Sequence, residues 1–255
     1  MSPRGSRARA PLHDLRSGRR RLDGPTSSYL FRVLRLTLGD ELSVFDPLAH
    51  TEARARVVRA DPHDGELDID EPGPSVVRAR RALVLVQSLS KGDKLDAIVR
   101  DATELGATAV VVARAQRSVV QVDGARAEAR LERLRRVAEQ AARQCGRGDP
   151  PEVEGPLDWS RALAEAVSRA SSASLGGAFC LHPRGAVTLG PTLVDAITRD
   201  GGLAFAIGPE GGLTDEELSE ASTAGFVTAS FGPLVLRTET VAAAVLGAVR
   251  VLDGD

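Results

Sequence analysis

The sequence predicts an α/β protein with a small β-rich N-terminal domain and a larger domain built on a mostly parallel sheet. Residues 41–70 alternate between polar and apolar side chains with turn residues between them, which is typical of antiparallel strands. From residue 82 onward, short apolar runs alternate with helical patterns, which indicates parallel strands covered on both faces. EPGPS, at residues 71–75, breaks both patterns, so we expect domains at residues 1–74 and 75–255.

The N-terminal domain is expected to be a small barrel-like module with one helix. Residues 27–36 show helical spacing, with three apolar side chains on one face. Asp-Pro and His-Asp-Gly turn signals then separate the strands that follow. The expected strands are residues 41–45, 52–60 and 66–70.

The C-terminal domain is expected to repeat a strand followed by a helix. The expected strands are residues 82–89, 107–113, 176–182, 202–208 and 226–232. The expected helices are residues 93–105, 125–144, 191–199, 214–224 and 240–252. Because parallel sheets bind ligands at the carboxyl ends of their strands, the segments after these strands are the first candidates for a site.

Composition and spacing exclude several classes of protein. No apolar run approaches the roughly 20 residues needed to cross a bilayer, and no apolar segment lies near the start, so we expect a cytoplasmic protein without a membrane partner. Cys145 and Cys180 are far apart and form no CxxC, which predicts two reduced, mostly inert thiols. The histidines are scattered without ligand spacing, so no metal is expected.

The cations are almost all arginine, since Lys91 and Lys94 are the only lysines. Arginine suits bidentate contact with phosphate, although a genome rich in G and C also explains its abundance. Residues 4–21 carry seven arginines against a single acidic residue, Asp14. This segment is either a nucleic-acid-facing arm or a frayed terminus, and composition alone favours the frayed terminus.

The stretch IGPEGGLTDEE, residues 207–217, joins an expected buried strand to an expected helix. It matches neither GxGxxG nor GxxxxGK[ST], and Glu210 places a carboxylate in the turn, so a phosphate site is disfavoured. Thr214 followed three residues later by Glu217 predicts a capping box. Taken by itself, the stretch is a tight connection whose glycines serve backbone geometry alone.

A second polar run ends the next expected strand. Its sequence, LRTET, places Arg237, Thr238, Glu239 and Thr240 where strand becomes helix. Polar residues at the end of one strand, beside a glycine loop at the end of its neighbour, indicate a pocket. The alternative is a mutual ion pair between Arg237 and Glu239 combined with helix capping.

IGPEGGLTDEE followed by LRTETV is similar to the SPOUT methyltransferases, and specifically to the RsmE family, which methylates N3 of a uridine in the decoding region of 16S ribosomal RNA. The likeness runs through most of the chain. Residues 18–46 resemble that family's PUA-like RNA-binding module, and KGDKLDAIVRDATELGA, RSVV and QCGR match its central stretches in order.

The resemblance implies a deep trefoil knot in the C-terminal domain, whereas general topology rules predict an unknotted sheet. It also implies S-adenosyl-L-methionine bound among three loops of the knot, with adenine held mainly by backbone groups and apolar contacts. For His182, a plain loop position stays open as an alternative. The implied cofactor-binding residues are Leu181, His182, Pro183, Ile207, Gly208, Pro209, Glu210, Gly211, Gly212, Phe231, Gly232, Leu234, Leu236, Thr238 and Thr240.

The implied reaction assigns two catalytic candidates. Uracil N3 carries a proton and is a poor nucleophile until that proton leaves, so the site must favour the anion and align it with the methyl group. Arg237 is the candidate for stabilising negative charge on the uracil oxygens, and Glu239 for orienting Arg237 or relaying the proton.

The implied substrate is 16S ribosomal RNA or the small ribosomal subunit, bound by a homodimer in which one subunit's N-terminal module serves the other's site. The target base must be unstacked or flipped while cations hold the RNA backbone. This context favours the RNA-facing interpretation of the arginine-rich start. The implied phosphate contacts are Arg16, Arg19, Arg20, Arg21, Arg32 and Arg35.

Several positions depart from the family pattern. Ser28 and Tyr29 replace a histidine pair, Pro47 begins a turn that is usually rich in glycine, and Asp101 and Leu234 stand where a lysine and an arginine are expected. Several of these changes remove cationic or polar side chains. The stretch IGPEGG, which the resemblance assigns to the cofactor, keeps the family pattern. Two alternatives therefore stay open: methylation of another RNA position, and a knotted RNA-binding protein without catalysis.

Overall fold

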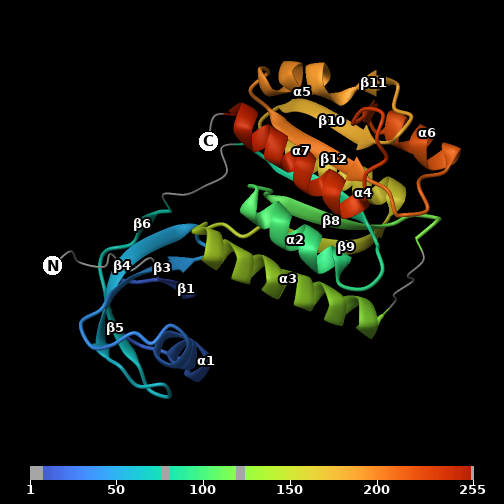
Figure 1. Ribbon diagram of the computed structural model, residues 1–255. Helices are drawn as coiled ribbons and strands as arrows, with labels where there is room; N and C mark the ends of the chain where they lie inside the picture. Colours follow the sequence, from blue (N-terminus) through green and yellow to red (C-terminus); the bar gives the residue numbers. More distant parts are fainter. Residues whose placement is uncertain (1–7, 76–80, 119–123, 254–255) are drawn as a thin grey trace. The chain divides into compact units, whose positions relative to one another are not determined.

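The computed structural model describes residues 8–75, 81–118 and 124–253 (Figure 1). The chain forms two compact units. The first contains residues 1–78 together with 142–149, and the second contains residues 79–141 and 150–255.

Among the described residues, the first unit forms a six-stranded sheet in the order β1-β3-β4-β5-β2, with β6 paired to β4. β1 runs parallel to β3, and the other pairs are antiparallel. The predicted strands correspond to β3, β4 and β5 and are confirmed. The strands are β1 (Arg9–Pro11), β2 (Gly18–Arg21), β3 (Glu41–Asp46), β4 (Thr51–Arg59), β5 (Glu66–Ile69) and β6 (Gly73–Pro74).

A short helix, α1 (Gly24–Ser28), continues as a π-helical turn, Tyr29–Val33. It begins after Asp23, whose carboxylate accepts a backbone hydrogen bond of 2.7 Å as an N-cap. The helical path cannot continue through Arg35, because this residue takes a left-handed φ of 55°. The helix predicted over residues 27–36 is therefore present, but it starts and ends earlier.

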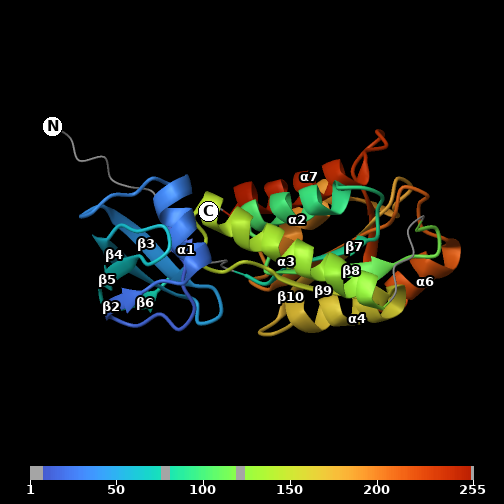
Figure 2. The same cartoon turned by 90° about the horizontal axis from the view of Figure 1, so that it is seen from below.

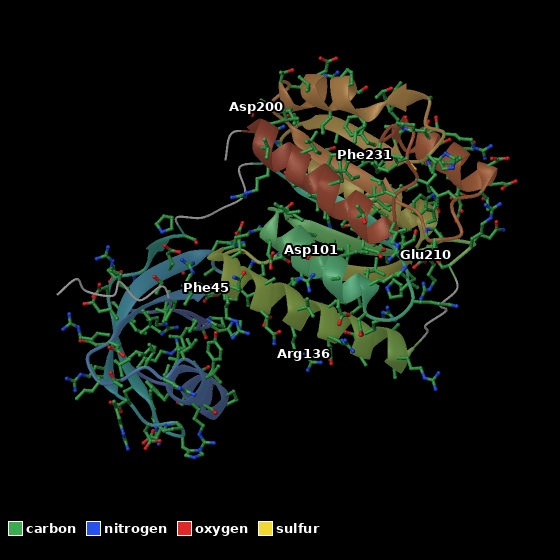
Figure 3. All side chains as sticks on the ribbon, viewed as in Figure 1. Phe45, Asp101, Arg136, Asp200, Glu210 and Phe231 are labelled. Atoms are coloured by element: carbon green, nitrogen blue, oxygen red, sulfur yellow. The ribbon has the colours of Figure 1, made fainter. Side chains whose placement is uncertain are left out.

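The arginine-rich start belongs to the sheet of the first unit. β1 pairs with β3 and β2 pairs with β5, so the prediction of a frayed terminus is wrong for these two strands. Arg9 lies over the ring of Phe45 at 5.3 Å and forms an ion pair of 2.9 Å with Glu52 (Figure 3 labels Phe45). Arg4 and Arg7 lie outside the described residues.

Among the described residues, the second unit forms a seven-stranded sheet in the order β11-β13-β10-β12-β7-β8-β9, and every pair is parallel. The strands are β7 (Leu83–Ser88), β8 (Ala109–Arg114), β9 (Glu152–Asp158), β10 (Leu175–Leu181), β11 (Val187–Thr188), β12 (Gly202–Ile207) and β13 (Val227–Ser230). The helices are α2 (Lys94–Glu104), α3 (Ala125–Cys145), α4 (Trp159–Ala170), α5 (Leu189–Ile197), α6 (Asp215–Thr223) and α7 (Thr238–Asp253). The predicted strands and helices are confirmed, whereas β9, β11 and α4 were not predicted.

Helices cover both faces of this sheet, as Figure 2 shows for α2 and α7 on one side and α4 on the other. α2, α3, α5 and α7 share one apolar core, in which Phe179 and Phe205 stack at 5.6 Å. α4 and α6 pack on the opposite face with Trp159. Every residue of β7 and β12 is buried, which explains why these strands read as continuous apolar runs. No helix in the described part of the chain is long and apolar enough to cross a bilayer.

The strand β13 lies between β10 and β11, although β10 and β11 follow each other in the sequence. The connection between these two strands, residues 182–186, runs directly against β13. The backbone N–H of His182 donates to the carbonyl of Ala229 at 3.0 Å, and a Cβ on Gly185 would lie 2.3 Å from the carbonyl carbon of Ala229. After β13, the chain continues into α7, which packs on α2, α5 and β12.

A partly buried ion pair joins the two ends of the second unit. The guanidinium of Arg81 donates to both carboxylate oxygens of Asp253, at 2.8 and 2.6 Å. It also donates to the backbone carbonyls of Gly201 and Ile197, at 2.9 and 3.1 Å. The end of α7 is therefore fixed beside the start of β7.

Candidate functional site

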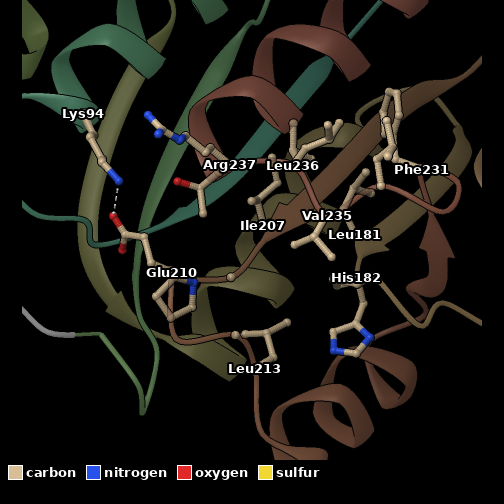
Figure 4. Close-up of a pocket in the computed structure, with 17 residues that line it drawn as sticks. Lys94, Leu181, His182, Ile207, Glu210, Leu213, Phe231, Val235, Leu236 and Arg237 are labelled. Atoms are coloured by element: carbon tan, nitrogen blue, oxygen red, sulfur yellow. Dashed lines mark hydrogen bonds and ion pairs between the residues drawn. The ribbon is translucent and has the colours of Figure 1, made fainter.

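A cavity of about 630 Å³ opens at the carboxyl edge of the parallel sheet (Figure 4). The segments after β7, β10, β12 and β13 bound it. The lining residues are Lys94, Leu181, His182, Pro183, Ile207, Gly208, Pro209, Glu210, Gly212, Leu213, Phe231, Leu234, Val235, Leu236, Arg237, Thr238 and Val241. Its size and its place in the sheet are those of a small-molecule site.

Most of the residues predicted to hold a cofactor line this cavity. Only Gly211, Gly232 and Thr240 of that set do not. Of the two catalytic candidates, Arg237 lines the cavity and Glu239 does not. The structure thus brings together three segments that are separated in the sequence.

Sequence reasoning missed four lining residues. Leu213, Val235 and Val241 are apolar neighbours of predicted residues. Lys94 comes from a different part of the chain, because it is the first residue of α2, after β7. The signal that could have found Lys94 is its rarity, since it is one of only two lysines in the chain and follows the end of an expected strand.

The segment between β12 and α6 forms a tightly packed wall, called here the glycine wall (residues 208–213). Gly208 is buried, and a Cβ at this position would lie 2.7 Å from Cγ of Leu213. Glycine therefore allows the buried Leu213 side chain to close against the turn. Gly212 has a φ of 74°, which a residue with a side chain rarely adopts. Arg117 donates to the backbone carbonyls of Gly211 and Leu213 at 3.3 and 3.4 Å.

Glu217 fixes the start of the helix that follows the glycine wall. Its backbone N–H donates to Oγ1 of Thr214 at 3.2 Å, and its Oε2 accepts from the backbone N–H of Thr214 at 2.8 Å. The predicted capping box is therefore confirmed. The second carboxylate oxygen accepts from the backbone N–H of Gln116 at 2.7 Å, in the segment after β8. This buried carboxylate connects the segment after β12 to the segment after β8.

Burial, reinforced by the charge of Glu217, raises the pKa of the Cys180 thiol to about 12. The thiolate is the reactive form of cysteine, so Cys180 is inert at neutral pH. No group of three or more His, Cys, Asp or Glu side chains within the described ranges is arranged to hold a metal ion.

The segment between β13 and α7 forms the other wall, called here the open wall (residues 231–237). It contains neither helix nor strand. Leu234 and Val235 are 73% and 79% exposed. Figure 3 labels Phe231 on this segment, and Figure 4 shows Phe231, Val235 and Leu236 around the cavity.

Four charged side chains lie near one end of the cavity. Lys94 Nζ is 2.9 Å from Oε1 of Glu210 and 3.8 Å from Oε2 of Glu239. Figure 4 shows the side chain of Arg237 on the same side of the cavity as this pair. Arg237 forms no ion pair with any residue that the structure describes, so the alternative of a mutual ion pair with Glu239 is wrong. Glu239 instead faces Lys94 and accepts a 3.2 Å hydrogen bond from Oγ1 of Thr238.

The ion pair keeps both of its members charged. The hydrogen bond to Glu210, with the charges of Glu210 and Glu239, raises the pKa of Lys94 against the opposing charge of Arg237. Burial tends to raise the pKa of Glu210, but the hydrogen bond from Lys94 and the charges of Lys94 and Lys91 bring this pKa below its ordinary value. Lys94 is therefore a cation and Glu210 an anion at neutral pH.

His182 lines the cavity and also closes its own turn. Its Nδ1 accepts a 3.2 Å hydrogen bond from the backbone N–H of Arg184. His182 is therefore placed both to contact a ligand in the cavity and to stabilise its own loop.

The six arginines predicted to contact phosphate lie in the first unit. Arg20 is held by two backbone carbonyls of the preceding loop, at 2.6 and 2.8 Å. Arg21 forms an ion pair with Asp64, and Arg32 hydrogen-bonds to His63 at 2.7 Å. These three side chains are already engaged on the surface of the unit.

The other three, Arg16, Arg19 and Arg35, are exposed. They form no ion pair within the described part of the chain. Their guanidinium groups present donors suited to phosphate without first breaking a salt bridge.

Sequence models of two protein families match this chain. Residues 78–250 match a family described as an RNA methyltransferase domain, and residues 22–70 match one described as an RNA methyltransferase PUA domain. The predicted PUA-like N-terminal domain is confirmed by the second match.

Individual proteins are similar over most of the chain. The ribosomal RNA small subunit methyltransferase E of Mycobacterium tuberculosis is 38% identical over 179 residues, which span 70% of this chain and 66% of that protein, just under two thirds of its length. The protein of the same name from Bacillus subtilis is 31% identical over 67% of this chain and 68% of its own. The crystal structure of a ribosomal RNA small subunit methyltransferase E from Neisseria gonorrhoeae bound to S-adenosyl methionine has a TM-score of 0.82 at 27% identity, over 97% of this chain and 98% of that one.

Proposed function

The chain belongs to the ribosomal RNA small subunit methyltransferase E family, and from this premise we propose that it transfers a methyl group from S-adenosyl-L-methionine to N3 of a uridine in 16S ribosomal RNA. The observation that carries the proposal is the cavity at the carboxyl edge of the sheet, since most of the residues that the family resemblance assigns to cofactor binding line it. We assign RNA binding to residues 1–74 and the reaction to residues 75–255.

The lining of the cavity fits the proposed cofactor. Ile207, Leu181 and Leu236 provide apolar surface for adenine, and the backbone of residues 207–212 provides polar groups beside it. The charged end of the cavity offers partners for the ammonium and carboxylate of the methionine part. When bound, the cofactor supplies an electrophilic methyl group on a positively charged sulfur. The Neisseria gonorrhoeae relative, which is bound to S-adenosyl methionine, supports this assignment.

Arg237 is the proposed electrostatic catalyst. Its side chain lines the cavity and has no carboxylate partner among the described residues, so it is available to stabilise negative charge on the uracil oxygens. Glu239, which follows Thr238 at the start of α7 and faces Lys94 and not Arg237, is proposed to relay the N3 proton. Holding the base in line with the methyl group supplies a further part of the acceleration.

The test of Arg237 is the turnover of Arg237→Ala at saturating cofactor. Loss of one well-placed donor at a developing negative charge lowers turnover by about 100-fold or more. Arg250→Ala, on the same helix at its other end, is the matched control and retains turnover. Turnover of Arg237→Ala close to that of the unaltered protein would remove Arg237 from the mechanism.

RNA binding is assigned to the arginines of the first unit. Arg16, Arg19 and Arg35 are the strongest candidates, because they are exposed and unpaired within the described residues. Each neutralised phosphate contributes about one to the slope of log affinity against log salt. Arg19→Ala is therefore expected to weaken RNA binding and to reduce this slope, which filter binding at several salt concentrations measures.

We propose that the C-terminal domain contains the trefoil knot of the SPOUT fold. The position of β13 between β10 and β11 supports this topology, because the chain that leaves β13 must pass the connection of residues 182–186 before it becomes α7. Gly185 of this connection lies so close to Ala229 of β13 that no side chain fits between the two segments.

A homodimer is part of the proposal. Leu234 and Val235 are mostly exposed beside the cavity, and a second copy of the chain would bury this apolar surface. Light scattering after size-exclusion chromatography is expected to give twice the mass of one chain, and Leu234→Asp combined with Val235→Asp to give the monomer.

Primer extension on 16S ribosomal RNA tests the function as a whole. Methylation at N3 blocks Watson–Crick pairing, so reverse transcriptase stops at the target in RNA from the parent strain and reads through in RNA from a deletion strain. A stop at another position in the parent strain would indicate a different target. Calorimetry that detects no binding of S-adenosylhomocysteine would indicate an RNA-binding protein without catalysis.

A further inference from the structure

Both lysines of the chain lie near the charged end of the cavity. The chain has 33 lysines and arginines, and only Lys91 and Lys94 are lysine. Both contribute to lowering the pKa of the same carboxylate, that of Glu210. Their contacts differ, however, because Lys94 forms an ion pair with Glu210 whereas Lys91 is exposed and forms no ion pair within the described residues.

Lys94 is placed between two carboxylates that come from different walls. Glu210 belongs to the glycine wall, at 2.9 Å from Nζ, and Glu239 follows the open wall, at 3.8 Å. An ammonium group has three donors and a compact charge, so it can serve two carboxylates that lie in different directions. With Arg237, these groups form a set of two cations and two anions.

Stability does not explain this arrangement. The side chains of Lys94 and Glu210 are 37% and 33% exposed, and ion pairs of this exposure contribute little to folding. The ion pair has a larger effect on the net charge that a ligand meets in the cavity. Without Lys94, the remaining groups, Arg237, Glu210 and Glu239, carry one unit of negative charge.

We propose that Lys94 is a positioning residue that neutralises Glu210 and Glu239, and thereby prevents these carboxylates from stabilising the cationic methyl donor before transfer. This inference rests on the proposed function. In methyl transfer, the sulfur keeps the electron pair of the broken S–C bond and loses its positive charge, while N3 supplies the pair for the new bond. Carboxylates beside the sulfonium stabilise the donor more than the transition state, which slows transfer. Uncompensated carboxylates also repel an acceptor that arrives as an anion.

The ratio of two dissociation constants isolates this effect. S-adenosylmethionine and S-adenosylhomocysteine share the adenosyl group, the ammonium and the carboxylate, and they differ by the methyl group and the charge on sulfur. The Kd of S-adenosylhomocysteine divided by that of S-adenosylmethionine therefore reports the field at the sulfur. Calorimetry on the full-length protein measures both constants without RNA.

Lys94→Gln is expected to raise this ratio by about three- to sevenfold, the effect of one unit charge several ångströms away in a partly solvated site. Glu210→Gln is expected to lower it, and the double variant to return it to the value of the unaltered protein. Lys94→Arg restores the charge and is expected to keep the ratio. Lys91→Gln is the matched control, because it removes the same charge without breaking an ion pair, and its ratio is expected to change much less than that of Lys94→Gln.

Kinetics with RNA give a second readout. Lys94→Gln is expected to lower KM for S-adenosylmethionine and to lower kcat as well, the pattern produced when the ground state is stabilised more than the transition state. If Lys94 had only a structural role, Lys94→Gln would raise KM or destabilise the fold. A lower unfolding midpoint would detect the loss of stability.

An unchanged ratio in folded Lys94→Gln would overturn the inference, as would an equal change in Lys91→Gln. The failure of the proposed function gives a different result, because the unaltered protein would then bind neither compound, or would bind both without methylating RNA. In the second case, the ratio still decides whether Lys94 balances the charge.

Discussion

The two walls of the cavity are built in opposite ways. The glycine wall has Leu213 buried and Gly208 packed against it, and Arg117, in the segment after β8, donates to the backbone carbonyls of Gly211 and Leu213. Directly after the wall, Glu217 joins the backbone of Thr214 to that of Gln116. The open wall places Leu234 and Val235 largely in solvent and has no regular structure. One wall is therefore packed within a single chain, and the other leaves Leu234 and Val235 mostly uncovered by the described residues.

The two walls suit two different tasks of a binding site, which are to hold a fixed shape and to adapt to a partner. A buried, hydrogen-bonded turn keeps its shape before the ligand arrives, which reduces the entropy lost on binding. An exposed apolar segment can adapt to a ligand or a second chain that covers it. The following predictions, in order of decreasing effect on stability, test whether the two walls differ in solution as they do here.

Leucine to alanine on each wall gives the largest expected contrast. Leu213→Ala removes a side chain that is 5% exposed and is expected to lower the free energy of unfolding by about 2–4 kcal/mol. Leu234→Ala removes one that is 73% exposed in the single chain and is expected to change it by less than about 0.5 kcal/mol in the monomer. Urea unfolding at a protein concentration that keeps the chain monomeric measures both. A loss for Leu234→Ala that appears only at higher protein concentration would place this side chain in the interface of the proposed homodimer, and a large loss in the monomer would contradict the exposure of the open wall.

Glu217→Ala tests the hydrogen bonds behind the glycine wall. It leaves the backbone N–H groups of Thr214 and Gln116 without their acceptor, and the expected loss is about 2–3 kcal/mol in the free energy of unfolding. Glu220→Ala, an exposed position on the same helix, is the control and is expected to change stability by less than about 0.5 kcal/mol. Equal changes at both positions would mean that the hydrogen bonds accepted by Glu217 do not stabilise the fold.

Gly208→Ala tests the close contact within the glycine wall. The added Cβ would meet Leu213, so we expect a loss of about 1–2 kcal/mol and weaker cofactor binding. Gly190→Ala is the control, because a Cβ there meets nothing within 4 Å and the position lies in α5. Calorimetry of cofactor binding together with urea unfolding separates the two effects. Unchanged cofactor affinity in Gly208→Ala would show that the turn adjusts more easily than its packing indicates.

Glu210→Gln gives the smallest change, and its sign depends on pH. The pKa of Glu210 in the folded protein is below its ordinary value of 4.5, so its contribution to stability is present above pH 4.5 and is lost as the pH falls through the folded value. Lys94 has a raised pKa, so its contribution is present below pH 10.5 and is lost as the pH rises through the folded value. The unaltered protein should therefore exceed Glu210→Gln slightly at pH 7, and this difference should shrink as the pH falls below 4.5 through the folded value. A difference that does not shrink as the pH falls, measured by urea unfolding, would contradict the ion pair as its source.

The sequence predicted most of the second unit, because its central strands are buried on both faces and read as apolar runs. β9 was missed, since EVEGPLD contains a Gly-Pro step that interrupts the pattern, and α4 was missed with it. β1 and β2 were missed because strands of three and four residues, rich in arginine, carry no alternation. In these segments, pairing with β3 and β5 decides the conformation, not local preference.

For the site, the loops after β10, β12 and β13 were predicted from their motifs and do line one cavity. Lys94 was not predicted, because its place depends on β7 lying next to β12, two strands that are more than a hundred residues apart in the sequence. Neither residue pattern nor spacing encodes the order of strands in a sheet. The contact between Lys94 and Glu210 follows from that order and could only be seen in three dimensions.

The ion pair between Arg81 and Asp253 has a practical consequence for protein engineering. It places the last described residue of α7 at the amino edge of the sheet, whereas the cavity lies at the carboxyl edge. A purification tag or fluorescent protein joined directly after Asp253 would therefore be attached at the edge of the sheet opposite the cavity. Immobilising the protein on a sensor surface through that end would leave the cavity accessible to small molecules.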